Sequence, residues 1–404
     1  MNIIMVCESA LVSGGAEKVA IQEALELRRR GIRVGYIAAN DSADPSLVEA
    51  GVEVLLLNTK SFYEETNRQE KMQKMFGNLK ILDSVQTFLK SFDPRDTAVH
   101  VHTYRLKLSG IVPHAAQELG FMTLIHCHDY SAVCPTSLWY DFRVGENCSR
   151  KPLSLACITC ECQNQAWKYK LPKLTSYFQN QKLWKINARS SGMIHITKLE
   201  RETTEKAVGK RSSALSLPPI SDFTSTKRVP VEQNKTFVFV GRLTREKGIY
   251  EFLECTAKAG VPAVVVGDGP LRVELETQYS HARFTGWLDQ VGIDSALRSA
   301  RALIVPSLWR ETLGLSVLDA MNLGVPSIVS DQVGAQEFIE DGVNGLIVDL
   351  PKLGNAIDRC SENGFVKGLS EAAFAAAQKN SFTVKKHVDQ LVAIYERSLE
   401  ESLP

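Results

Sequence analysis

The chain has 404 residues, 44% of them hydrophobic and 23% charged, and its 47 basic and 46 acidic residues leave a net charge of +1. This length exceeds what one compact core usually holds, so two domains are expected. A near-neutral chain is not attracted as a whole to nucleic acid or to a membrane, and any electrostatic attraction must come from local patches. No segment approaches the roughly 20 apolar residues needed to span a bilayer.

The first apolar run, residues 2–7, lacks the charged start and the long apolar region of a secretory signal. It leads directly into Gly14 and Gly15. We therefore expect a buried strand there and a cytoplasmic protein. In the cytoplasm the nine cysteines are expected to be thiols or metal ligands rather than disulfides.

Short apolar runs rich in β-branched residues alternate with helix-like segments along most of the chain. Such strands are typical of parallel sheets that helices cover on both faces. A helix over 17–30 is ended by Gly31, and a final helix over 384–398 has an apolar stripe. The predicted strands are 2–7, 33–38, 52–57, 98–101 and 122–126 in the first half, and 236–240, 263–266, 302–305 and 327–329 in the second.

Residues 215–234 separate the two series of strands and are rich in proline and poor in apolar residues, as interdomain linkers are. We expect an α/β fold of two doubly wound, Rossmann-like domains facing a cleft, with ligands at the carboxyl ends of the strands. The expected parts are an N-terminal domain at 1–218, a C-terminal domain at 219–383, and a helix at 384–404 that packs back on the N-terminal domain.

Glycine turns follow several predicted strands. Gly14 and Gly15 precede the first helix, where backbone N–H groups can approach an anion or a sugar. Gly269 lies in a Gly-Asp-Gly-Pro turn after a strand of the second half. Thr285 follows a short extended stretch whose backbone can contact a nucleobase. The alternative for the glycines is a tight turn without a ligand.

A basic loop follows the strand that opens the second half. It carries Arg242 and Lys247 at the carboxyl end of that strand. Two cations there suit a diphosphate, because arginine offers a planar fork of donors and lysine a point charge. The alternative is a solvated basic loop.

The strongest signal comes just after the strand at 302–305. Gly314 is expected to open a helix that ends at Gly324, so the free N–H groups of Gly314 and Leu315 would point at an anion. Glu311 lies just before this helix and Asp319 one turn beyond Leu315. Two carboxylates beside an anion site suit the hydroxyls of a sugar and a ribose. The alternative is a capping glutamate with an unrelated aspartate.

Taken together, these motifs resemble those of glycosyltransferase family 4, the retaining glycosyltransferases of the GT-B fold. The resemblance covers most of the chain and is densest from 237 to 349. It is carried by Gly14-Gly15-Ala16-Glu17, His128-Asp129, Gly241-Arg242 with Lys247, Gly267-Asp268-Gly269-Pro270, and the segment from Glu311 to Asp319.

The resemblance implies a nucleoside-diphosphate-sugar donor and a role for each matching residue. Arg242 and Lys247 would hold the diphosphate, and Gly269 and Thr285 would line the donor site. Glu311 would bind hydroxyls of the transferred sugar, and the N–H groups of Gly314 and Leu315 would bind the distal phosphate. Asp319 would bind the ribose. Gly15 would lie against the donor phosphate or the acceptor.

The same resemblance makes His128 and Glu311 the catalytic candidates, with His128 over the sugar near the anomeric carbon. It implies retention of configuration by same-face attack. No cofactor is required, because basic groups and helix dipoles stabilise the departing diphosphate. The alternative for His128 is a buried, hydrogen-bonded residue at a strand end, since His126 lies two positions earlier on the same face.

Two positions depart from the family pattern. Asp319 stands where the family usually has a glutamate, and Leu313 where it usually has an aromatic residue. Because the side chain of Asp319 is one methylene shorter, we expect this difference to affect the affinity for the donor rather than the class of reaction.

Five of the nine cysteines lie in the segment 134–162, after His128. Cys157 and Cys160 have the spacing that presents two thiolates to one tetrahedral ion, and Cys134 and Cys148 can supply the other two, with Cys162 in reserve. A structural zinc would order a segment that has little apolar periodicity. An iron–sulfur cluster and free or disulfide-forming thiols are the alternatives.

Between Cys162 and Leu199 there is no acidic residue, while lysines and arginines are interleaved with aromatic residues. This composition suits the anionic cytoplasmic face of a membrane, where a lipid-linked acceptor would lie. The alternative is a solvated helix face over a domain core.

Three other functions compete with sugar transfer. A nucleotide-sugar epimerase and a glycan phosphorylase share the expected fold, and a nucleic-acid-binding protein would use the cysteines and the basic segment. The last leaves the glycine and carboxylate motifs unexplained, so we expect no nucleic-acid partner. The family resemblance favours a glycan or lipid-linked glycan acceptor, in lipopolysaccharide, capsule or exopolysaccharide biosynthesis.

Overall fold

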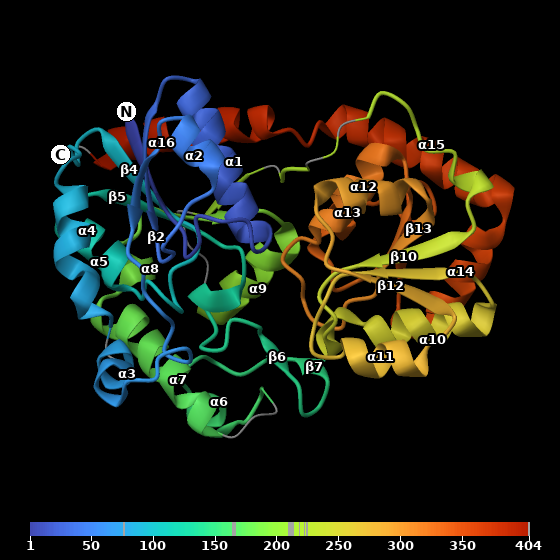
Figure 1. Ribbon diagram of the computed structural model, residues 1–404, viewed down its shortest axis with the longest axis horizontal. Coiled ribbons are helices and arrows are strands. Elements are labelled where there is room, and N and C mark those ends of the chain that lie inside the picture. Colours follow the sequence, from blue (N-terminus) through green and yellow to red (C-terminus); the bar gives the residue numbers. More distant parts are fainter. Residues whose placement is uncertain are drawn as a thin grey trace.

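A computed structural model describes residues 1–402 except 76, 164–166, 209–213, 218, 222 and 224. It contains two separate parallel sheets, one in each half of the chain, and helices pack against both (Figure 1). This arrangement confirms the predicted α/β class with two doubly wound domains. Among the residues described, no helix is both long and apolar enough to cross a lipid bilayer.

The first domain has a seven-stranded sheet in the order β3-β2-β1-β4-β5-β8-β9, with parallel pairing throughout. Its strands are β1 (Asn2–Val6), β2 (Arg33–Ala38), β3 (Glu53–Leu56), β4 (Thr97–Val101), β5 (Met122–His126), β8 (Gly192–His195) and β9 (Ala214–Ser216). Its helices are α1 (Gly15–Arg29), α2 (Pro45–Glu49), α3 (Arg68–Met75), α4 (Leu82–Leu89), α5 (Ile111–Glu118), α6 (Leu155–Thr159), α7 (Leu171–Phe178), α8 (Ile186–Arg189) and α9 (Lys198–Val208).

The second domain has a six-stranded parallel sheet in the order β12-β11-β10-β13-β14-β15. Its strands are β10 (Thr236–Val240), β11 (Ala263–Val266), β12 (Ala282–Gly286), β13 (Ala300–Val305), β14 (Ser327–Ser330) and β15 (Leu346–Val348). Its helices are α10 (Ile249–Ala259), α11 (Arg272–Gln278), α12 (Gln290–Arg298), α13 (Leu315–Leu323), α14 (Leu353–Ser361) and α15 (Asn363–Asn380).

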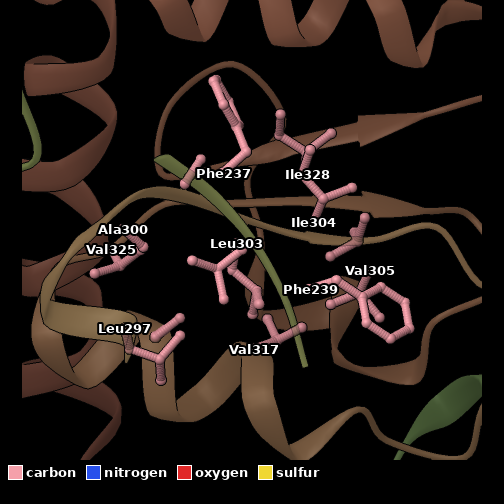
Figure 2. Packing of buried hydrophobic residues seen from close by; sticks show 14 of the residues in the cluster. Phe237, Phe239, Leu297, Ala300, Leu303, Ile304, Val305, Val317, Val325 and Ile328 are labelled. Atoms are coloured by element: carbon pink, nitrogen blue, oxygen red, sulfur yellow. The ribbon is translucent and has the colours of Figure 1, made fainter. Parts of the chain in front are cut away.

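The core of the second domain forms where the apolar strands β10 and β13 meet the helix α13. Phe237, Phe239, Leu303 and Val317 are at most 2% exposed: Leu303 lies near Val317 of α13, and the register of β10 with β13 puts Phe237 and Phe239 on the other face of the sheet (Figure 2). These strands hold the loops at their carboxyl ends in fixed positions, and those loops carry most of the predicted site residues.

Part of the segment predicted to be a polar linker is structured. Residues 214–216 form β9, at the edge of the first sheet. Phe223, Val229 and Val231 are buried in the core of the second domain. Pro218, the last residue of the expected first domain, lies outside the described residues.

The C-terminal helix α16 (Val384–Ser402) returns from the second domain to the first, where it lies near α1 (Figure 1). Its apolar face, which includes Val388, Leu391 and Tyr395, is buried in the core of the first domain. Arg30 pairs with Asp389 at 2.8 Å on its edge. The last helix thus belongs to the first domain in space.

A small antiparallel hairpin, β6 (Tyr140–Asp141) and β7 (Glu146–Asn147), projects from the first domain towards the second (Figure 1). It belongs to the cysteine-rich segment that follows β5.

Candidate active site

The amino ends of α1 and α13 approach each other across the boundary between the two domains. A Cβ on Gly15 would lie only 2.8 Å from Cδ1 of Leu315. No side chain caps either helix, since Gly14 and Gly314 occupy the two cap positions. Uncapped N–H groups and two helix dipoles therefore converge on one place, which suits an anion.

Gly314 is required by the backbone of its loop. Its φ of 88° favours glycine, and a Cβ would lie 2.8 Å from Cγ1 of Val333. The helix that it opens ends at Gly324, as the sequence predicted. Leu313, the residue that departs from the family pattern, is buried.

Glu311 lies beside this helix end and is held by two partners. Its carboxylate accepts a hydrogen bond from Nζ of Lys247 at 2.6 Å and another from Oγ of Ser307 at 2.6 Å. Burial opposes ionisation, but Lys247, Ser307 and Arg242 outweigh it and keep the pKa of Glu311 below its usual value. An ionised Glu311 can accept hydrogen bonds from sugar hydroxyls.

Lys247 reaches Glu311 because its loop is packed against the loop after β13. Gly248 makes this contact, since a Cβ there would lie 1.9 Å from the carbonyl oxygen of Pro306. The backbone N–H of Leu308 also donates to the carbonyl of Glu246 at 2.8 Å. Arg242 is exposed in the same loop. The structure thus brings both predicted diphosphate ligands to the side of Glu311.

The glycines after β11 bring neighbouring loops together. A Cβ on Gly267 would lie 2.0 Å from the carbonyl oxygen of Gly241, and one on Gly269 would lie 2.5 Å from that of Leu243. Close packing of loops therefore explains why Gly269 is glycine, and its donor role stays a prediction. Thr285, near the end of β12, donates its hydroxyl to the carbonyl of Gly286 at 3.0 Å.

Asp319 lies at the contact between the two domains. Its carboxylate accepts a hydrogen bond from Oγ of Ser221 at 2.6 Å, and Lys18 of α1 lies near it. Asp319 and Leu315 line a small pocket together with Lys18, Gln22 and Ile220. Burial raises the pKa of Asp319 to about 6. Since Ser221 already binds the carboxylate, the ribose role predicted for Asp319 stays a prediction.

His128 also lies at the domain boundary. Its backbone carbonyl accepts a hydrogen bond from Oγ1 of Thr312, and the carbonyl of Thr312 accepts one from Oγ1 of Thr197. Its ring Nε2 lies 2.8 Å from Nδ1 of His102. Burial and the neighbouring imidazole of His102 hold the pKa of His128 well below its usual range, so the ring is neutral at pH 7.

Beneath His128 lies a cluster that sequence reasoning missed. Glu23 is fully buried on α1, and its pKa lies well below the usual value because His102 and His100 outweigh the effect of burial. The signal was available: two His-x-His pairs end two neighbouring parallel strands, and the register of β4 and β5 places them side by side. The cluster comprises Glu23, His100, His102, His126 and His387.

The five cysteines after His128 surround one largely apolar cavity of about 350 Å³. Their sulfur atoms do not form a ligand set in the described part of the chain, because no group of three or more potential ligand atoms within 4.8 Å of one another includes them. Instead Arg143 donates to Sγ of Cys160 at 3.0 Å, and Arg150 lies 3.7 Å from Sγ of Cys148. The structure gathers the cysteines without bringing four sulfurs to one point.

Polar contacts hold this segment together. Asp141 is 2% exposed and pairs with Arg143 at 3.1 Å and with Arg150 at 2.9 Å. Arg105 donates hydrogen bonds to the backbone carbonyls of Ser131, Cys134 and Pro135.

The cysteine-rich segment also contacts the second domain. Nδ2 of Asn147 donates to Gln332 at 2.8 Å, and Oδ1 of Asn147 accepts from the backbone N–H of Arg310 at 3.0 Å. The N–H of Glu311 in turn donates to the carbonyl of Gln332. The hairpin of the cysteine-rich segment therefore adjoins the loop of Glu311.

Comparisons with known proteins fit this geometry. Residues 234–363 match the family model described as "Glycosyl transferases group 1". The alpha-D-kanosaminyltransferase of Streptomyces kanamyceticus is 25% identical over 183 residues, which cover 42% of this chain and 47% of that protein. The phosphatidyl-myo-inositol mannosyltransferase of Mycobacterium tuberculosis is 30% identical over 171 residues, which cover 39% of this chain and 45% of that protein. The chain thus spans about half the length of these curated relatives.

Solved structures resemble the whole chain. Anabaena HepE in complex with UDP and glucose has a TM-score of 0.69 at 18% identity, over 97% of this chain and 98% of HepE. WaaG, a glycosyltransferase involved in lipopolysaccharide biosynthesis, has a TM-score of 0.64 at 14% identity, over 96% of this chain and 98% of WaaG. The chain therefore has the GT-B fold. Its second domain is a glycosyltransferase group 1 domain, and the resemblance to family 4 holds.

Proposed function

We propose that this protein is a retaining glycosyltransferase that moves a sugar from a nucleoside-diphosphate sugar to a glycan or lipid-linked glycan. One observation carries the proposal: two uncapped helix ends, Arg242, and the Lys247–Glu311 pair meet at one side of the domain boundary. The group 1 match at 234–363 covers the domain that holds most of these residues.

In this proposal the donor diphosphate lies between the helix ends of α1 and α13. Arg242 and Lys247 balance its charge, and the N–H groups of Gly314 and Leu315 bind its distal phosphate. As the bond from the anomeric carbon to the phosphate oxygen breaks, these groups stabilise the charge that develops on that oxygen.

The acceptor hydroxyl bonds to the anomeric carbon from the same face, and its proton passes to the departing phosphate oxygen. Glu311 positions the sugar through its hydroxyls. Lys247 and Ser307 hold Glu311 in place. The neutral ring of His128 would lie beside the anomeric carbon, with its orientation fixed by His102.

The donor can be identified by a panel of nucleoside-diphosphate sugars in a thermal-shift assay. A ligand at one hundred times its dissociation constant stabilises the fold by about 2.7 kcal/mol. HepE is in complex with UDP and glucose in its crystal structure. UDP-sugars are therefore the first donors to test. Incubation with the donor alone tests the epimerase alternative, because an epimerase would release an isomer and a transferase would not.

The acceptor side includes an exposed apolar face on α7 and its flanking turns η3 (Trp167–Tyr169) and η4 (Gln179–Leu183). Phe178 is 48% exposed and Leu183 63% exposed, while Lys182 and Lys185 lie exposed beside them. The other face of α7 is buried. The exposed side is therefore apolar and basic.

We therefore propose that this face rests on the anionic cytoplasmic surface of a membrane, where a lipid-linked acceptor lies. The names of the phosphatidyl-myo-inositol mannosyltransferase and of WaaG, a lipopolysaccharide enzyme, support a role in lipopolysaccharide, capsule or exopolysaccharide assembly. Vesicles with anionic lipid should sediment the protein, and zwitterionic vesicles should not. Trp167→Ser should weaken sedimentation, while Trp287→Ser, which changes an exposed tryptophan of the second domain, should not.

The structural zinc at Cys134, Cys148, Cys157 and Cys160 remains a proposal. Their shared cavity supports it, and the distance between the sulfurs requires a shift of the side chains on binding. Protein prepared under reducing conditions should then contain zinc bound to sulfur, and Cys157→Ser should release it. If neither zinc nor iron is found bound to sulfur, these cysteines are thiols.

A further inference from the structure

The interior of the first domain holds a carboxylate surrounded by imidazoles. Glu23 and His100 are fully buried, and His102 and His126 are at most 5% exposed. They come from three elements: Glu23 from α1, His100 and His102 from the end of β4, and His126 from the end of β5. The proposed sugar-transfer chemistry uses none of them directly.

The distances among these groups are those of a coordination sphere. Oε2 of Glu23 lies 3.3 Å from Nδ1 of His100 and 3.2 Å from Nε2 of His102, and Oε1 lies 3.8 Å from Nδ1 of His126. One ligand atom of each residue lies within 4.8 Å of all the others. Bonds of about 2.0–2.1 Å around a tetrahedral zinc place neighbouring ligand atoms about 3.3 Å apart.

Five polar atoms of this group are buried without a well-formed hydrogen bond. Oε2 of Glu23, Nε2 of His100, Nε2 of His102 and both ring nitrogens of His126 are buried without a hydrogen-bond partner. Each such atom costs about 1–3 kcal/mol when nothing replaces its contact with water. Several such atoms within one group of close ligand residues favour a ligand that accepts lone pairs, which a metal ion does.

Neighbouring residues also hold three of these four side chains. Nε2 of His387 donates to Oε1 of Glu23 at 2.8 Å, the hydroxyl of Tyr395 lies 2.6 Å from Nδ1 of His100, and Nδ1 of His102 lies 2.8 Å from Nε2 of His128. Metal ligands in proteins are commonly oriented by hydrogen bonds of this kind. His102 therefore has Nε2 towards Glu23 and a supporting contact on Nδ1, while His100 and Glu23 are each held by one further residue.

We propose that Glu23, His100, His102 and His126 bind one first-row transition-metal ion, for which Zn²⁺ suits three imidazoles and a carboxylate best. The site is closed, with four protein ligands, so its role is structural. It ties α1, which presents Gly15, to the strands β4 and β5, which lead to the site of His128. With the metal on Nε2 of His102, its Nδ1–H donates to His128 and fixes that ring.

X-ray absorption on the full-length protein, purified under reducing conditions, tests this site without any variant. We expect about one zinc per chain in nitrogen and oxygen ligation at about 2.0–2.1 Å, with the outer scattering of imidazole. Sulfur ligation at about 2.3 Å alone would assign the metal to the cysteines and overturn the proposal. Protein without metal, which also takes up none from added Zn²⁺, would overturn it too.

Variants locate the ion. His126→Gln and Glu23→Gln should each lower the zinc that survives dialysis against a chelator at least tenfold and remove the imidazole signal. His281→Gln, at an exposed histidine of the second domain, should retain the wild-type content. Circular dichroism identifies any variant that does not fold. If a variant does not fold, the X-ray absorption spectrum of the wild-type protein alone decides the question. Full retention of nitrogen-bound zinc in folded His126→Gln and Glu23→Gln would overturn the proposal.

Discussion

The buried carboxylate of Asp319 should make the stability of the protein depend on pH. Its side chain is 7% exposed, and burial raises its pKa from 3.8 to about 6 despite Ser221 and the nearby Lys18. An acid whose pKa is higher in the fold than in the unfolded chain is destabilising when ionised. Its contribution to stability is therefore present below pH 3.8 and is lost as the pH rises through about 6. At 1.36 kcal/mol per pH unit the loss is about 3 kcal/mol.

Asp319→Asn removes the charge and keeps an oxygen for the hydroxyl of Ser221. We expect the variant to be more stable than wild type at pH 7.5 by up to about 3 kcal/mol, and the difference to shrink towards pH 4. Urea unfolding of both proteins at several pH values measures it, because the other titrating groups cancel in the difference. A difference that does not change with pH would refute the reasoning. If the carboxylate binds the donor ribose, Asp319→Asn should also weaken donor binding in calorimetry, whereas Asp319→Glu should preserve it.

Three further predictions concern the second domain. Glu311→Ala should abolish sugar transfer and also lower the melting temperature, because it leaves the largely buried Lys247 without its partner; turnover within a few-fold of wild type would contradict its role. Arg242→Ala should weaken calorimetric binding of the free nucleoside diphosphate and of the sugar donor alike, by about 1.5–3 kcal/mol for a lost charged hydrogen bond. An effect on the sugar donor alone would show that Arg242 does not contact the diphosphate. Gly248→Ala should cost clearly more stability than Gly260→Ala: both glycines have positive φ, but only at Gly248 would the new Cβ meet the carbonyl of Pro306. Equal losses of about 1 kcal/mol would mean that the loop contact is not tight.

The central strands of both sheets were predictable because each is a nearly continuous apolar run between helices. β8, β9 and β15 were missed; they are only three or four residues long, and β9 and β15 lie at sheet edges. The turn and helix at Gly314 were also predictable, because glycine is needed at both ends of α13. Patterns of this kind involve residues that are close in the sequence, so they can be recognised in one sequence alone.

The surroundings of the site were less predictable because they depend on contacts between distant segments. Ser307 and Lys247 meet at Glu311 only because two loops pack together. The partner of Asp319, Ser221, comes from the segment taken for a linker. The histidines around Glu23 come from separate elements, and His387 arrives with the last helix.

The return of α16 to the first domain has a consequence for motion. The chain crosses between the domains twice, once near Ser221 and once just before α16. The N–H of Ser221 donates to the carbonyl of Phe382 at 3.0 Å, so the two crossings are tied to each other. Paired crossings act as a single hinge, and a rotation of the domains about it would break the contacts of Thr312 with His128 and Thr197.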